Sequence, residues 1–301
     1  MKAIAYSIFG AKRQRREGCF SFESYLRGLL LNIRFNRLIY PGWTNAVMVE
    51  AETYDAWKGL FEMLSDRGLI MMTICDNNRP LCESMLWRLK PVFWLRKNSD
   101  IFMFSHVLCR DLDSLCTYRE AQAVATWMEN DKVAHAITDS VSHTIPMMGG
   151  MIGFRSSGIC GRMDVSTFEE LLALNPHPLD KKGSDQKFLN TIIYPKMATH
   201  GDDSITQHYF KGHGNTWLSD FHTCNCWLHA VARGHEDNCP ENTKIDLPEI
   251  LKETNEISQH IGAAGYNSIH VDRIIEERKE EFQDIIEIEQ LYPDLFYWNK
   301  K

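Results

Sequence analysis

The sequence lacks any apolar run that approaches the roughly 20 residues needed to span a bilayer. It also lacks a secretion signal, because its first apolar stretch is short and no small-residue cleavage site follows it. There is no internal repeat and no low-complexity linker. These absences argue against a membrane-spanning or secreted protein and predict a cytoplasmic one.

Positive charge is scarce as well. The chain has 33 Lys and Arg against 40 Asp and Glu, which makes a net charge of −7 and an isoelectric point near 5.9. This balance argues against generic binding of polyanions, although a local basic patch stays possible. The nine cysteines are an odd number without a secretion signal, so we expect reduced thiols.

The 301 residues, 44% of them hydrophobic, are enough to bury a substantial core. Apolar patterns predict strands at 3–9, 45–49, 101–109 and 135–139, a further apolar run at 69–75, and helices at 22–38, 54–64, 84–95, 118–128 and 186–194, the last ended by Pro195. This alternation predicts an α/β sheet with helices on its faces. Such sheets bind ligands beyond the carboxyl ends of their strands.

Beyond about Gly212 the sequence becomes polar and rich in Cys and His, and a long charged helix is expected over about 271–291. This part has little apolar material, so it is expected to pack on the preceding domain and not to fold alone. We therefore expect a catalytic domain at 1–212 and a C-terminal extension at 213–301.

Two aspartates, Asp111 and Asp113, follow the apolar run that ends at Cys109. Carboxylates at positions i and i+2 can face one cation when the backbone turns there. Mg²⁺ and Mn²⁺ prefer oxygen ligands and are often shared between carboxylates and substrate phosphates. The pair therefore predicts a metal site for a diphosphate, although D-x-D alone also occurs in ordinary loops and helix caps.

Several segments, in the right order, resemble the retaining glycosyltransferases of the glycogenin and bacterial galactosyltransferase type. D-L-D at 111–113 is similar to the D-x-D motif of glycosyltransferases with the GT-A fold. The other matches are MLWRLK at 85–90 with Y-x-R-L, PMMGGMIGF at 146–154 with N-x-G-v, SDQKFLN at 184–190 with D-Q-d-x-L-N, and HYFKG at 208–212 with H-F-x-G. A narrower group of bacterial and viral glycosyltransferase-like proteins is also similar, over R-D-x-D-S, R-E and P-x-x-G-G-x-x-G. The likeness covers about residues 1–212 and lacks a clear K-P-W after His208.

The resemblance implies a GT-A fold, a single Rossmann-like and mostly parallel α/β sheet with helices on both faces, here with a C-terminal helical extension. It also implies a UDP-sugar donor, Mn²⁺ (or Mg²⁺), and retention of the anomeric configuration. The site residues so predicted are Asp111, Asp113 and His208 for the metal; Ser7, Phe9, Gly10, Arg88, Gly149, Gly150 and Lys211 for the donor; and Asp185, Gln186 and Asp139 for the reaction.

Plainer interpretations stand beside these roles. Arg88 could form a surface ion pair on a helix, and Asp185 could cap the helix that begins near it. His208 is one of twelve histidines, with His260 as a rival ligand. Asp139 and His143 could bind acceptor hydroxyls or act as a base if the reaction inverts the anomeric centre.

A Cys/His-rich stretch follows the likeness. Its density is compatible with a structural Zn²⁺ site, but it lacks the paired spacing of zinc ribbons and fingers, and reduced loop thiols are the alternative. The residues are His222, Cys224, Cys226, His229, His235 and Cys239.

The sequence thus favours a metal-dependent glycosyltransferase that acts on a glycan hydroxyl. A second hypothesis is a DNA-modifying glycosyltransferase that acts on a hydroxymethylated base. This hypothesis is supported by the basic loop at 12–16 and by Arg27, Arg34 and Arg37. A third is a non-catalytic module that binds nucleotide sugars or carbohydrate.

Overall fold

The computed structural model describes residues 1–12, 22–77, 79–114, 116, 118–138, 145–199, 202–209 and 279–295. Within these ranges seven strands form one sheet in the order β3-β2-β1-β4-β6-β5-β9. The pairs β2–β3, β1–β4 and β5–β9 are parallel, and β6 runs antiparallel to both β4 and β5. The mostly parallel α/β fold class predicted from the sequence is confirmed, and it is consistent with a GT-A-like Rossmann fold.

The chain divides into two compact units. Unit 1 comprises Met1–Ala5, Arg79–Arg110 and Arg119–Asp246, and unit 2 comprises Tyr6–Asn78, Asp111–Tyr118 and Leu247–Lys301. β1 (Lys2–Ile8) contributes residues to both units. None of the described helices is long and apolar enough to cross a membrane.

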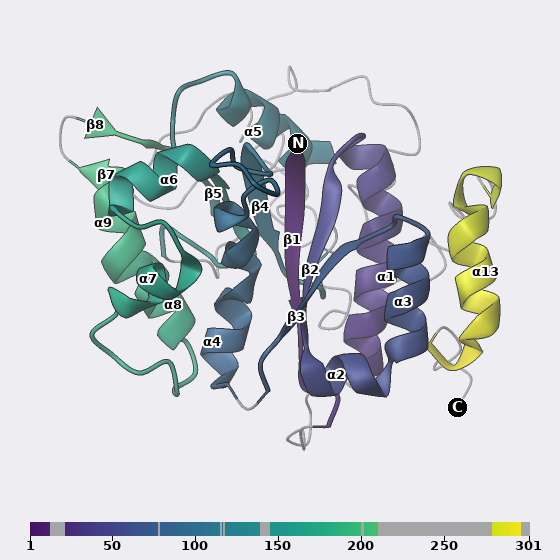
Figure 1. Ribbon diagram of the computed structural model, residues 1–301. Helices are drawn as coiled ribbons and strands as arrows, with labels where there is room; N and C mark the ends of the chain where they lie inside the picture. Colours follow the sequence, from purple (N-terminus) through teal and green to yellow (C-terminus); the bar gives the residue numbers. More distant parts are fainter. Residues whose placement is uncertain are drawn as a thin grey trace, which may run out of the picture. The chain divides into compact units, whose positions relative to one another are not determined.

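Unit 2 contains the end of β1, the parallel pair β2–β3 and several helices (Figure 1). Its elements after β1 are α1 (Phe22–Ile39), β2 (Thr44–Glu50), α2 (Ala51–Ala56), α3 (Lys58–Asp66), β3 (Met71–Cys75), the 3-10 helix Lys279–Phe282, α13 (Gln283–Leu291) and the 3-10 turn Pro293–Leu295. The one helix expected over 54–64 is two, because the backbone leaves the helical region at Trp57 (φ −128°). The centroid of the Trp57 ring lies 6.4 Å from that of Phe22 and 6.5 Å from that of Tyr292.

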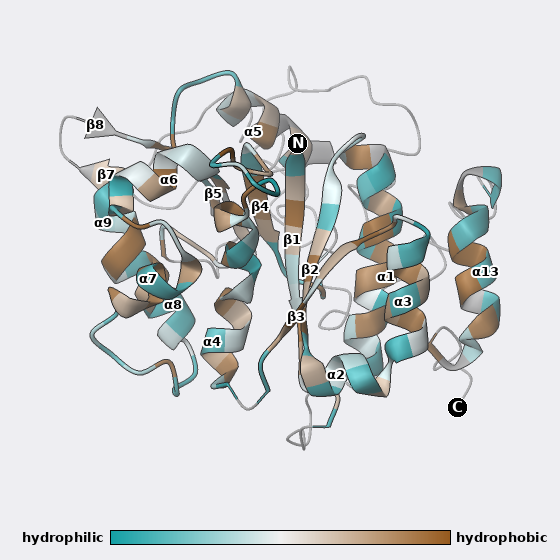
Figure 2. Ribbon diagram, in the orientation of Figure 1, coloured by the Kyte–Doolittle hydropathy of each residue, from teal (hydrophilic) through white to brown (hydrophobic). Residues whose placement is uncertain are grey.

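The C-terminal helix is part of the core of unit 2. Phe282, Ile285, Ile288 and Leu295 are all buried. Figure 2 shows that α13 carries both hydrophobic and hydrophilic residues, the composition of a helix that packs by one face. Of the helix expected over 271–291, the described part begins as a 3-10 turn at Lys279 and becomes α-helical at Gln283.

Unit 1 contains the remaining strands. Its elements are α4 (Leu81–Leu86), the 3-10 helix Trp87–Phe93, β4 (His106–Arg110), α5 (Tyr118–Met128), β5 (Ala134–Thr138), β6 (Met151–Arg155), α6 (Ser156–Met163), α7 (Phe168–Ala173), α8 (Ser184–Phe188), the π-helix Leu189–Ile193, α9 (Tyr194–Met197), β7 (Ala198–Thr199), β8 (Asp202–Asp203) and β9 (Ile205–Tyr209).

Three predictions in unit 1 are wrong at prolines or turns. The helix expected over 84–95 is α-helical only to Leu86 and then tightens into a 3-10 helix around Pro91, which cannot donate a backbone hydrogen bond. The strand expected from residue 101 begins at His106, because Leu95 and Phe102 instead pair across a hairpin. Pro195 does not end its helix, since it lies in the first turn of α9 after a π-helical turn.

Candidate active site

The acidic pair lies in a turn directly after β4. Leu112, between the two aspartates, is only 4% exposed, whereas Asp111 and Asp113 are both partly exposed. One buried side chain therefore anchors the turn, and the two aspartates beside it are less buried.

Two contacts with α1 hold the backbone of this turn. The side-chain amide of Asn32 donates hydrogen bonds to the carbonyl oxygens of Gly28, at 2.9 Å, and Leu112, at 3.3 Å. Gly28 is so close that a Cβ atom there would overlap with the Leu112 carbonyl oxygen. Because this carbonyl is contacted by two residues of one helix, the aspartates on either side extend from a constrained backbone.

The acidic turn carries the type of ligand that a hard divalent cation prefers. Asp111 and Asp113 offer carboxylate oxygens, the ligands that Mg²⁺ and Mn²⁺ prefer. Among the described residues, no three His, Cys, Asp or Glu side chains form a group that could hold a metal ion. Two carboxylates suit a cation that completes its coordination with phosphate oxygens and water, which is how Mg²⁺ is commonly bound.

His208 lies in β9, in a row of rings within unit 1. It is 1% exposed, and its ring centroid is 5.2 Å from that of His135, which in turn stacks on Trp127 at 5.4 Å. Burial lowers the pKa of His208 to about 4, and a backbone hydrogen bond involving Ala123 opposes this only in part. The imidazole is therefore neutral at pH 7, the form that can bind metals. Its role as a third ligand stays a prediction.

Residues far apart in the sequence meet around Arg88 in unit 1. Arg88 is buried in the 3-10 helix after α4, with Nη1 3.5 Å from the carbonyl oxygen of Arg110. A Cβ atom on Gly149 would overlap with Nη2 of Arg88 and lie 3.0 Å from Nε2 of Gln186. The Gly149 N–H also donates to Oε1 of Gln186 at 3.2 Å. The structure thus brings Arg88, Gly149 and Gln186 together, and the burial of Arg88 rules out the surface ion pair considered above.

Asn190 fastens the glycine segment to the helix that carries Asp185 and Gln186. Its Nδ2 donates to the carbonyl oxygens of Met147 and Gln186, both at 2.8 Å, and its Oδ1 accepts from the Met147 N–H at 2.9 Å. Asp185 is buried, and its Oδ2 accepts from Nε2 of Gln186 at 3.3 Å. The N-cap residue is Gly183, without a side-chain cap, so Asp185 does not cap this helix.

A buried ion pair that we did not predict from the sequence supports the Gly149–Gly150 turn. Nε of Arg110 lies 4.0 Å from Oε2 of Glu120, and both side chains are 1% exposed. Nη1 of Arg110 donates to the carbonyl oxygen of Gly150 at 3.3 Å. The resemblance contains both residues as R-D-x-D and R-E, but their pairing could not be derived from a single sequence.

The turn after β1 is held by a buried carboxylate in unit 2. Gly10 has a positive φ of 87°, and its N–H donates to Oε2 of Glu50 at 2.7 Å. Thr53 donates to the same oxygen at 2.9 Å. Ser7 and Phe9 are both partly exposed. Glycine is required at position 10 because other residues rarely adopt this backbone conformation.

The three arginines that favoured a DNA-binding surface lie in unit 2, and two of them are buried. These are Arg27 and Arg34, and the guanidinium of Arg34 lies 5.4 Å from the centre of the Phe282 ring. Arg37 is exposed and forms an ion pair with Asp284. Because only one of the three is exposed, they do not form a basic surface together. Other predicted residues lie outside the described ranges: Asp139, Lys211, His143, His260, the loop at 13–16 and the Cys/His stretch at 222–239.

No known protein family's profile matches the chain, and no curated protein sequence matches it. A 4-diphosphocytidyl-2C-methyl-D-erythritol synthase from Anaerococcus prevotii is similar in structure, with a TM-score of 0.38, 11% identity, and coverage of 75% of this chain and 96% of that one. A mannosyltransferase from Pyrobaculum calidifontis, in complex with GDP-Man and Mn²⁺, has a TM-score of 0.35 and 13% identity, and the match covers 79% of this chain and 65% of that one. Both likenesses are distant.

Proposed function

We propose that this protein is a metal-dependent glycosyltransferase that moves a sugar from a nucleoside diphosphate sugar, a UDP-sugar by resemblance, to a hydroxyl of a glycan acceptor. The observation that carries the proposal is the acidic turn. It contains two partly exposed aspartates on either side of one buried leucine, immediately after a central strand of an α/β sheet. This is the edge at which such sheets bind ligands.

Asp111 and Asp113 would hold Mn²⁺ or Mg²⁺. When bound, the metal would supply Lewis-acid neutralisation of the charge on a departing diphosphate. Arg88 donates hydrogen bonds to phosphate oxygens, for which the planar fork of its guanidinium is suited. Asp185 and Gln186 orient the sugar through its hydroxyl groups.

The arrangement in unit 1 supports these roles. A buried carboxylate and a buried guanidinium are costly to desolvate unless they have polar partners. Their presence in unit 1 therefore favours a role in binding a polar ligand. The missing side chain at Gly149 leaves the space that the end of Arg88 and Gln186 occupy. The turn that ends at Gly10, with Ser7 and Phe9 before it, is proposed to receive the nucleotide.

The test is hydrolysis and transfer from a set of nucleotide sugars, with and without Mn²⁺. Asp113→Asn should abolish metal-dependent turnover, whereas Asp100→Asn, which removes the charge of an exposed aspartate, should leave it unchanged. Binding of a nucleotide sugar without turnover would support the non-catalytic module instead. Turnover that survives both a chelator and Asp113→Asn would contradict the proposal.

A further inference from the structure

Asn32 connects the acidic turn to the interior of unit 2. Its side chain is fully buried in α1, and its Nδ2 reaches the Leu112 carbonyl oxygen. Its Oδ1 accepts a hydrogen bond from the hydroxyl of Tyr6 at 3.3 Å. A buried amide is costly unless its polar atoms are bonded. The directions of these bonds therefore fix both the rotamer of Asn32 and the position of the carbonyl that it holds.

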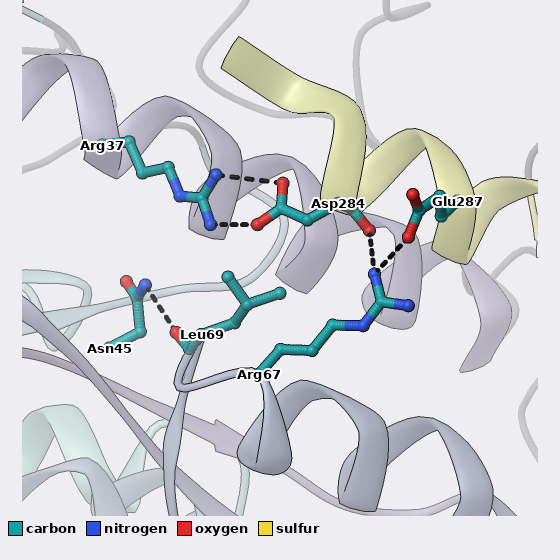
Figure 3. A network of polar contacts seen from close by, with 6 residues as sticks. All are labelled: Arg37, Asn45, Arg67, Leu69, Asp284 and Glu287. Carbon is teal, nitrogen blue, oxygen red and sulfur yellow. Dashed lines mark hydrogen bonds and ion pairs between the residues drawn. The ribbon is translucent and has the colours of Figure 1, made fainter. Parts of the chain in front are cut away.

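The chain of buried amides continues away from the turn. Nδ2 of Asn36, one helical turn further along α1, donates to the Tyr6 hydroxyl at 2.9 Å and to Oδ1 of Asn45 at 2.7 Å. Nδ2 of Asn45 donates to the carbonyl oxygen of Leu69 at 3.1 Å, the bond drawn in Figure 3. Asn32 and Asn36 are thus alike in residue type, helix and burial, but only Asn32 touches the acidic turn.

The C-terminal helix α13 forms polar contacts with α1 in the same unit (Figure 3). Both Nη atoms of Arg37 donate to the carboxylate of Asp284. Nη1 of Arg67 donates to the carbonyl oxygen of Asp284 and to Oε2 of Glu287, both at 2.9 Å. The helix that carries Asn32 is therefore held at its other end by a segment about 250 residues away in the chain.

We infer that Asn32 is a positioning residue for the metal site: its amide holds the Leu112 carbonyl so that Asp111 and Asp113 are presented to one cation. The inference rests on the proposed function, which makes these carboxylates the metal ligands. Groups that orient ligands from behind commonly change metal affinity by 10- to 100-fold when they are removed.

The experiment compares Asn32→Leu with the matched control Asn36→Leu, because leucine has the same number and branching of side-chain heavy atoms as asparagine but cannot form its hydrogen bonds. Mn²⁺ affinity is measured by electron paramagnetic resonance of free Mn²⁺, and hydrogen exchange of the peptide 110–114 is measured without metal. Both variants should unfold at a lower temperature than the wild type. Only Asn32→Leu should raise the Mn²⁺ dissociation constant, by about 10-fold or more, and speed exchange in the turn.

A second variant, Asn32→Asp, keeps the acceptor for Tyr6 but loses the donor to Leu112, so it should weaken Mn²⁺ binding as well. Unchanged Mn²⁺ affinity in either folded Asn32 variant, while Asp113→Asn loses binding, would overturn the inference and leave the proposed function intact. If the wild type itself does not bind Mn²⁺, the proposed function fails, and with it Asn32 as a metal-site residue. Faster exchange at 110–114 in Asn36→Leu to the same extent would also overturn the inference.

Discussion

Gly28 in α1 and Leu112 in the acidic turn are in such close contact that no side chain fits between them. A Cβ atom on Gly28 would overlap with the Leu112 carbonyl oxygen and lie 2.9 Å from its carbonyl carbon. The obstructing atoms belong to the backbone, so they cannot move aside as the end of a flexible side chain can. The helix and the turn therefore have to separate if this glycine is replaced.

Replacing Gly28 with alanine should lower the free energy of unfolding by about 1–3 kcal/mol, the usual cost of overpacking, despite the better helix propensity of alanine. It should also weaken Mn²⁺ binding, because the turn has to shift. Gly161→Ala is the control, since nothing lies within 4 Å of a Cβ there, and its free energy of unfolding should stay within about 1 kcal/mol of the wild type. Urea unfolding measures the free energy of unfolding of both variants. Equal stabilities for the two variants would show that the contact with Leu112 carries no strain.

Gly149→Ala should separate activity from stability in unit 1. The added methyl group would meet the end of Arg88, a flexible side chain that can move at little cost to folding. The guanidinium would then leave its present position, and kcat/KM for the nucleotide sugar should fall by about 10- to 100-fold. The melting temperature should change little. Full activity in this variant would remove Arg88 from donor binding.

Stability should decrease in mild acid because folding disfavours the charged form of two histidines. Burial lowers the pKa of His106 to about 4, with the positive charges of Arg155 and Lys2 adding to the effect, and burial likewise lowers the pKa of His208 to about 4. The unfolded chain binds these protons near pH 6.5 and the folded chain does not, so stability is lost between about pH 6.5 and 4. For the nearly fully buried His208 the loss approaches about 3 kcal/mol at the acid end.

Urea unfolding at about pH 7 and pH 5 measures this loss of stability. Both pH values lie above the pKa values of ordinary carboxylates, so the histidines dominate the difference. His106→Gln should reduce the loss of stability between pH 7 and pH 5. The reduction should be smaller than the share of His208, because His106 is half-buried and screened by water. A wild type with equal stability at both pH values would show that neither histidine is kept neutral by folding.

Breaking the longer of two ion pairs should cost more stability than breaking the shorter one, because the longer pair is buried. Arg110 and Glu120 are 4.0 Å apart and buried, whereas Arg67 and Glu287 are 2.9 Å apart and partly exposed. Glu120→Ala leaves a buried guanidinium without its carboxylate, so it should cost about 3–5 kcal/mol. Glu287→Ala should cost less than about 1 kcal/mol. Thermal and urea unfolding of both variants would test this, and a larger loss for Glu287→Ala would contradict it.

Hydrophobic periodicity was enough to place the central elements. The strands expected at 3–9 and 45–49 are Lys2–Ile8 and Thr44–Glu50, and the helices expected at 22–38 and 118–128 are Phe22–Ile39 and Tyr118–Met128. Buried strands and amphipathic helices produce hydrophobic patterns among neighbouring residues, so these patterns can be recognised in a single sequence. The pattern was insufficient around Pro91 and Pro195, where the local backbone adapts to a proline through 3-10 and π turns.

The sequence by itself determined the α/β class and the position of Asp111 and Asp113 directly after a strand. Only the tertiary structure decided that Arg88, Gly149 and Gln186 meet, that Glu120 pairs with Arg110, and that Asn32 holds Leu112. Contacts of this kind join residues from ten to eighty positions apart through buried polar contacts and close backbone approaches. They leave no periodic trace in the chain, because each depends on one side chain and one place in the folded core.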